Sequence, residues 1–152
     1  MKVIGFNFTK ISANKNKEFK AGPSISTNIE FKDIEPVKFD ILKEENVLKN
    51  TFKFSVIYSE KEEGKEKHDQ KEKIAEVNFE GIILLSVSKE ESKNILKAWK
   101  KKETPQEMRF PLFNLILSKC SIKALNLVEE IGLPFHTPLP QIRPQQKQEN
   151  QP

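Results

Sequence analysis

The stretch AEVNFEGIILLSVSKEE, residues 75–91, contains the change of pattern that decides the fold. As far as Val87, apolar residues recur at every second position, which is typical of a strand with one buried face. Ser88 and Glu91 then give the sequence of a capping box, in which a hydroxyl and a carboxylate satisfy unpaired amides at the start of a helix. The sequence therefore predicts strands before residue 88 and helices after it.

Alternation of the same kind marks the chain before this stretch. Proline cannot donate a hydrogen bond to a sheet, so Pro36 predicts a break, followed by further extended chain at Val37, Phe39 and Ile41. Gly81 predicts a bulge or a close approach of another backbone segment. The predicted strands cover residues 4–8, 25–31, 52–58 and 75–87.

Residues 60–73, EKEEGKEKHDQKEK, contain no apolar side chain. Such a segment buries nothing, so it is predicted to be a solvated hairpin tip between the last two strands. His68 lies inside it and is interpreted as an exposed polar group. We expect a single domain over residues 1–142, followed by a disordered polar tail over residues 143–152.

Two helices are predicted after residue 88. The first runs from the Ser88 cap to about Lys102, and the second begins at Thr104 and Pro105, because proline suits the first helical position. The second helix is apolar on most of its circumference. Its sequence contains three local signals: Pro111 predicts a kink or a delayed start, Ser121 a new cap, and Gly132 a left-handed end.

A helix that is apolar all round is buried on several sides, whereas one small sheet covers only one of them. We therefore expect a second copy of the chain to cover the rest, in a dimer or a tetramer. The residues predicted to form this oligomer interface are Phe110, Leu112, Leu115 and Ile116.

Composition narrows the classes of protein. The 152 residues carry a net charge of +4, and one cysteine, Cys120, fits a reducing compartment, so a cytoplasmic location is expected. Neither a membrane-spanning run nor a secretory signal is recognisable. A lysine cluster surrounds Trp99 and is interpreted as the solvated end of a helix. A basic nucleic-acid-binding sheet module and a purely structural oligomerisation protein remain as alternatives, and nucleic acid is the less expected partner.

Catalysis is not predicted. The sequence contains no glycine-rich phosphate loop, no metal-ligand spacing and no nucleophile elbow, so no cofactor and no metal are expected. His68 and His136 are the two histidines, too few for a metal site of convergent ligands. Cys120 and His136 would form a thiol and base only if they met, and Cys120 on an apolar helix is interpreted as structural.

After the expected helix end, residues 132–140, GLPFHTPLP, stay apolar although three prolines exclude both a helix and a central strand. The order of such features resembles the SecB-like protein-export chaperones. The resemblance rests on the ordered series FNFTKISANKN, VKFDI, FKFSVIYSEKEEG, AEVNFEGIILLSV, MRFPLFNLIL and GLPFHTPLPQI, and spans most of residues 4–142.

The resemblance implies an α+β fold, with a four-stranded antiparallel sheet and C-terminal helices packed on one side. It also implies an ATP-independent chaperone, or holdase, that binds unfolded polypeptides in hydrophobic grooves as a dimer of dimers and keeps preproteins competent for export. The groove residues that it implies here are Phe31, Phe39, Phe113, Leu117, Leu133, Phe135, Leu139 and Ile142.

The chain also departs from the pattern of the export chaperones. Those chaperones are acidic and dock a translocation motor, whereas this chain is basic, and Asn114 stands where the family helix has an arginine. A general holdase, or one dedicated to a particular client as in relatives linked to toxin–antitoxin systems, therefore fits at least as well.

Overall fold

The computed structural model describes the chain except for residues 19–21, 39–45, 61–72, 143 and 145–152. The strands pair antiparallel in the order β1-β4-β3-β2, so β1 and β2 form the two edges of one sheet. The elements are β1 (Lys2–Lys15), β2 (Ser24–Val37), β3 (Asn46–Ser59), β4 (Lys73–Val87), α1 (Lys89–Lys100) and α2 (Gln106–Glu130).

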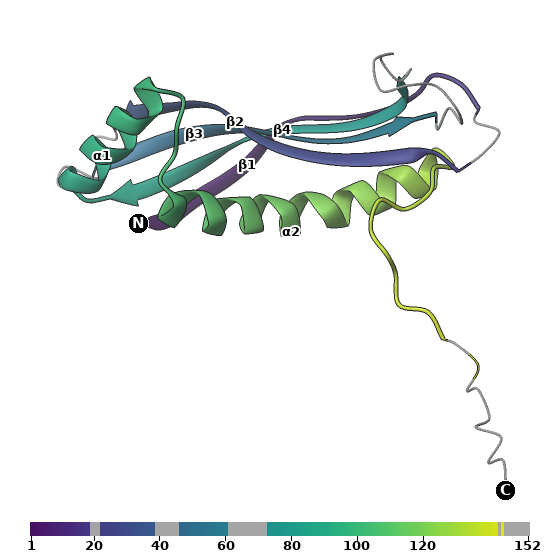
Figure 1. The fold of residues 1–152 in the computed structure, drawn as a ribbon. Coiled ribbons are helices and arrows are strands. Elements are labelled where there is room, and N and C mark those ends of the chain that lie inside the picture. Colours follow the sequence, from purple (N-terminus) through teal and green to yellow (C-terminus); the bar gives the residue numbers. More distant parts are fainter. Residues whose placement is uncertain (19–21, 39–45, 61–72, 143, 145–152) are drawn as a thin grey trace, which may run out of the picture.

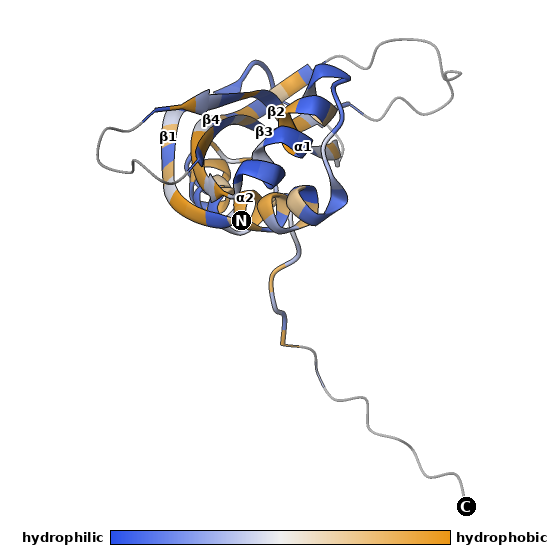
Figure 2. Ribbon diagram, turned by 90° about the vertical axis from the view of Figure 1, so that its left-hand side faces the viewer, coloured by the Kyte–Doolittle hydropathy of each residue, from blue (hydrophilic) through white to orange (hydrophobic). Residues whose placement is uncertain are grey.

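The two helices lie on one side of this sheet. α2 runs along its length, and α1 packs at the end where the N-terminus also lies (Figure 1). Figure 2, which looks at the molecule from that end, shows the sheet as a curved layer over α2. This is the predicted α+β fold of a four-stranded antiparallel sheet with C-terminal helices on one side.

The core lies between the sheet and α2 and is rich in phenylalanine. Phe52, Phe54 and Phe79 are fully buried on the helix-facing side. Phe6 and Phe8 on β1 extend this cluster, with ring centroids 5.3 Å from Phe52 and 5.7 Å from Phe79, respectively. Edge-to-face and tilted ring pairs of this kind add to the free energy that burial of the rings supplies.

Gly81 allows the cluster to close. A Cβ atom at this position would lie 2.6 Å from the Phe52 ring and 2.6 Å from the carbonyl oxygen of Asn7. The adjacent strand β1 has a register shift between Phe8 and Lys10, directly beside the pairing of Phe8 with Gly81. The prediction of a bulge or a close approach at Gly81 is therefore confirmed in both respects.

The predicted break at Pro36 is wrong. β2 continues through Pro36, which pairs with Leu48, to its end at Val37. A proline fits there because β2 is an edge strand, and the missing amide hydrogen takes no bond away from an inner strand. Phe39 and Ile41 lie outside the described residues, as does most of the predicted hairpin tip.

The middle of the outer face of the sheet carries a row of charges of alternating sign. Lys10, Glu80, Lys53 and Glu30 stand opposite one another across β1, β4, β3 and β2. Opposite charges in directly paired positions attract, and a shift of one residue would remove every such pair. The row therefore favours the observed register of all four strands.

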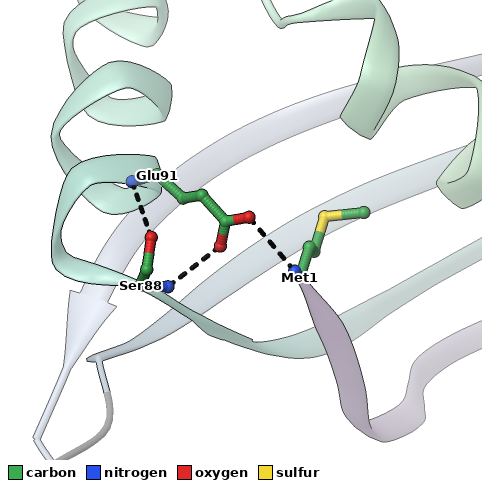
Figure 3. Close-up of polar contacts among 3 residues, drawn as sticks. All are labelled: Met1, Ser88 and Glu91. Atoms are coloured by element: carbon green, nitrogen blue, oxygen red, sulfur yellow. Dashed lines mark hydrogen bonds and ion pairs between the residues drawn. The ribbon is translucent and has the colours of Figure 1, made fainter.

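The predicted capping box at the start of α1 is confirmed. The Ser88 hydroxyl accepts a hydrogen bond from the Glu91 amide at 3.1 Å, and the Glu91 carboxylate accepts one from the Ser88 amide at 2.9 Å (Figure 3). The same carboxylate receives the amino group of Met1 at 3.3 Å. These bonds fix the direction in which the chain leaves β4 and attach the start of β1 to it.

α2 is one unbroken helix, contrary to the kink or restart predicted at Pro111 and Ser121. Pro111 is exposed and lies within the first two turns. Because proline has no amide hydrogen, one intrahelical hydrogen bond is lost, and only near the helix start. The predicted cap at Thr104 is also wrong, because Pro105 is the N-cap residue. The end at Gly132 is confirmed: its φ is 70°, and the amide of Leu133 donates to the carbonyl of Val128.

Candidate functional site

α2 buries a single stripe of side chains that recurs every four residues. This buried stripe comprises Met108, Leu112, Ile116, Cys120, Ala124 and Val128. Because four residues turn the helix by slightly more than one full turn, the stripe advances slowly around the helix and follows the twisted sheet. Burial raises the pKa of the Cys120 thiol to about 12, so this cysteine is a packing residue rather than a nucleophile.

The stripe opposite the sheet is uncharged and partly apolar. This outward stripe comprises Phe110, Asn114, Ser118, Ile122 and Asn126, at the same four-residue spacing. Phe110 is 57% exposed and Ile122 is 68% exposed, which are large fractions for apolar residues. The guanidinium group of Arg109 lies 5.4 Å from the centre of the Phe110 ring, and both side chains still remain more than half exposed.

On the flank of α2 that faces β1, lysine side chains cover aromatic rings. Lys119 places its ammonium group 5.9 Å from the centre of the Phe6 ring, and Lys123 lies 5.4 Å from that of Phe8. Cations in this position are attracted by the ring face while their charged ends remain in water. The aromatic residues of β1 are therefore shielded from above by charged side chains.

The flank that faces β2 carries no charge between Phe113 and Leu125. Phe113 packs against Phe31 of β2, with ring centroids 4.9 Å apart, and Leu117, one turn further along, is 42% exposed. On β2, Ile25 is also exposed and Ile29 is half-buried. These five residues, which we call the β2-side band, form an apolar surface along one edge of the molecule.

The segment after α2 is attached at one end of this band. Leu133 is buried in the core, the Tyr58 hydroxyl donates a 2.6 Å hydrogen bond to the carbonyl of Pro134, and the His136 ring stands edge-on to Phe54 at 6.5 Å. We call residues 133–137 the strap. Burial raises the pKa of Tyr58 to about 12, so its hydroxyl remains a hydrogen-bond donor at neutral pH.

Beyond the strap the chain turns away from the body of the molecule (Figure 1). Leu139 is 44% exposed and Ile142 is fully exposed. Residues 135–141 alone line an open hollow on this segment. The strap is therefore packed through Leu133, Pro134 and His136, whereas Phe135 within it and the chain beyond it are exposed.

The predicted groove residues thus fall into three groups. Phe31, Phe113 and Leu117 come together in the β2-side band, whereas Leu133 lies in the core. Phe135, Leu139 and Ile142 are exposed on the segment that follows α2, and Phe39 lies outside the described residues.

The predicted oligomer interface is also divided. Leu112 and Ile116 belong to the core of their own chain and Leu115 is partly buried against that core, so Phe110 is the most exposed of the four. The sequence reading missed Ile25, Ile122 and Tyr58. The position of Ile122, three steps of four residues after Phe110, was the signal for it, but a helix apolar all round does not reveal which stripe faces the sheet.

The arrangement of one antiparallel sheet with two C-terminal helices is the one that the resemblance to SecB-like chaperones predicts. Neither a family model nor a curated protein sequence gives a significant match to the chain. Among solved structures, the chain is similar to the Mycobacterium tuberculosis Rv1957 SecB-like chaperone in complex with a ChAD peptide from the Rv1956 HigA1 antitoxin. The similarity covers 95% of this chain and 92% of that one, at 12% sequence identity and a TM-score of 0.47.

The described part of the chain contains no cluster of three or more histidine, cysteine, aspartate or glutamate residues suited to a metal ion. Neither described helix has an apolar run of the length that crossing a bilayer requires.

Proposed function

We propose that the chain is an ATP-independent chaperone of the holdase type, which binds unfolded polypeptides through the β2-side band and the exposed residues beyond the strap. The observation that carries the proposal is an uncharged apolar band on a protein in which 32% of residues are charged. Large apolar surfaces on soluble proteins usually mark interaction sites. Aromatic and aliphatic side chains attract apolar segments of many sequences, because the hydrophobic effect has no direction.

The outward stripe of α2 has a separate role in this proposal. We infer that a second copy of the chain covers Phe110 and Ile122, so that helices of two copies pack face to face in a dimer or tetramer. The asparagine and serine residues between them are small enough for close approach. This leaves the β2-side band open on the flank of the helix, where an extended client has access from solvent.

The same geometry disfavours the nucleic-acid alternative. The described strand phenylalanines lie on the helix-facing side of the sheet, where they form the core. Base stacking would require aromatic side chains on an open face. The outer face instead carries paired lysines and acids. The proposal includes a cytoplasmic location. It applies equally to a chaperone dedicated to one client and to a chaperone that serves many clients.

Light scattering tests the proposal. An unfolded client protein diluted into buffer should aggregate less when the chain is present, without ATP and with little change between low and high salt, because apolar contacts are not screened. Suppression that disappears as salt rises, together with preferential binding of oligonucleotides, would favour the basic module instead.

A further inference from the structure

His136 is held in an unusual way. Both ring nitrogens are shielded from solvent, and neither has a hydrogen-bond partner among the residues that the structure describes. The ring packs edge-on against Phe54, which is fully buried. Buried polar groups are nearly always hydrogen-bonded, and one that is not costs free energy. The strap therefore places a polar imidazole ring in an apolar contact.

The surface beneath the strap is also apolar. At this end of the sheet, β3 presents Phe54, Val56 and Tyr58 toward the helix side, and β2 presents Ile25, Thr27 and Ile29. Ile25 and Ile29 already belong to the β2-side band, so the strap covers the continuation of that band. The Tyr58 hydroxyl is the one polar group there for which a bond to the strap is observed, and its acceptor is a main-chain carbonyl.

We propose that the strap is a self-ligand that protonation of His136 releases, uncovering an additional length of apolar surface for an extended polypeptide. The strap occupies this surface as a client would, with apolar side chains and with one main-chain carbonyl on Tyr58. A client that replaces it can offer the same carbonyl whatever its sequence. This inference rests on the proposed function for the identity of the ligand, but not for the movement itself.

The charge balance around His136 gives the direction of the effect. Among the groups on the packed elements, Tyr58 stays neutral. Lys15 at the end of β1 forms a 3.0 Å ion pair with Glu18, and Glu129 and Glu130 at the end of α2 are exposed. Burial lowers the pKa of His136, and no described residue forms an ion pair with it.

Protonation of His136 is thermodynamically linked to opening of the strap. The open state exposes the imidazole to water, where its pKa is about 6.5, so the open state binds the proton more tightly than the closed one. The closed strap is fully favoured above that pH and loses stability as the pH falls below it. Opening rises by at most about tenfold per pH unit, the limit for a single proton.

Nuclear magnetic resonance tests the movement directly. The chain has two histidines, and the matched control His68→Gln assigns the two imidazole titrations. We expect His136 to titrate below the ordinary value and the methyl signals of Leu133, a core anchor of the strap, to shift between pH 7.5 and 5.5. In His136→Phe, which keeps a ring against Phe54 but cannot be protonated, those signals should not respond to pH, and His136→Leu should behave alike.

Binding of an unfolded peptide without histidine or acidic residues gives the second readout. We expect it to tighten at pH 5.5 for the natural chain and for His68→Gln, but not for His136→Phe. Unchanged Leu133 signals, or an equal pH response in His136→Phe, would overturn the proposal. If the strap opens with pH and the peptide binds at neither pH, the movement is established and the chaperone function is wrong.

Discussion

The two flanks of α2 face the two edges of the same sheet, yet they differ in charge. Toward β1, Lys119 and Lys123 lie over the rings of Phe6 and Phe8. Toward β2, Phe113 and Leu117 continue the helix surface without a charge, and Phe31 meets them from the sheet. Both flanks therefore have aromatic residues at their base, and only one is covered by cations.

This difference indicates how a protein separates a surface kept in water from one kept for a partner. A lysine stem covers apolar area while its ammonium group remains solvated, so the β1 flank is shielded without a partner. The β2 flank has no such cover and is left for one. Exchanging the chemistry of the two flanks should therefore exchange their behaviour.

The largest expected effect on stability comes from a change in the buried stripe, and the effects of changes on both flanks are compared with it. Ile116→Ala should cost about 2–5 kcal/mol of unfolding free energy, because it leaves a cavity in a fully buried position. The matched change Ile122→Ala, on the outward stripe, should leave that free energy nearly unchanged and weaken self-association. Urea denaturation and sedimentation measure the two. Equal destabilisation by both changes would contradict the division of α2 into stripes.

Charge introduced on the β2 flank is the next test. Leu117→Lys should weaken client binding by about tenfold or more, since desolvating an ammonium group opposes an apolar contact. Its unfolding free energy should change by less than about 0.5 kcal/mol, because the position is already 42% exposed. Fluorescence anisotropy of a labelled unfolded peptide is the measurement. Undiminished affinity would remove the β2-side band from the binding surface.

The reciprocal change concerns the β1 flank. Replacing Lys119 and Lys123 by leucine removes two cation–aromatic contacts, each worth about 0.5–1 kcal/mol at exposed sites. The double variant should bind clients on this flank as well, or associate with itself, and dye binding to apolar surface should increase. A charge-preserving control, Lys119→Arg with Lys123→Arg, should behave like the natural chain.

The smallest effect lies away from both flanks. Lys102 follows the C-cap residue of α1, Lys101, and has a φ of 59°, a left-handed conformation that favours glycine. Lys102→Gly should raise the unfolding free energy by about 0.5 kcal/mol and leave client binding unchanged. The loss of the contact between Lys102 and Trp99, 4.8 Å in the structure, should appear in tryptophan fluorescence. A loss of client binding in this variant would show that the lysine cluster contributes to the site.

The sequence predicted those parts of the fold that local signals determine. The capping box at Ser88 and the left-handed end at Gly132 each depend on a few neighbouring residues, and both predictions are confirmed. The break at Pro36 was predicted wrongly because its effect depends on whether β2 is an edge strand, which only the sheet order decides. Pro111 is tolerated because it lies close to the start of α2.

The candidate site could be predicted only in part for a similar reason. Phe110, Ile116 and Leu117 are all apolar residues on one helix, and the hydrophobic pattern does not distinguish the core position from the two exposed ones. Tertiary packing makes that distinction, through the buried stripe that the twisted sheet selects. His136 shows the same limit, because whether its ring nitrogens have a hydrogen-bond partner depends on residues distant in the sequence, and none of the described ones provides it.

The sheet order has a consequence for the synthesis of the protein on the ribosome. β1 is made first but pairs only with β4, the last strand of the sheet. At a usual rate of about 5–20 residues per second, β1 waits several seconds for its partner. During that interval the valine, isoleucine and phenylalanine side chains of β1 are exposed on a growing chain. The protein thus begins its existence in the condition of the polypeptides that we propose it binds.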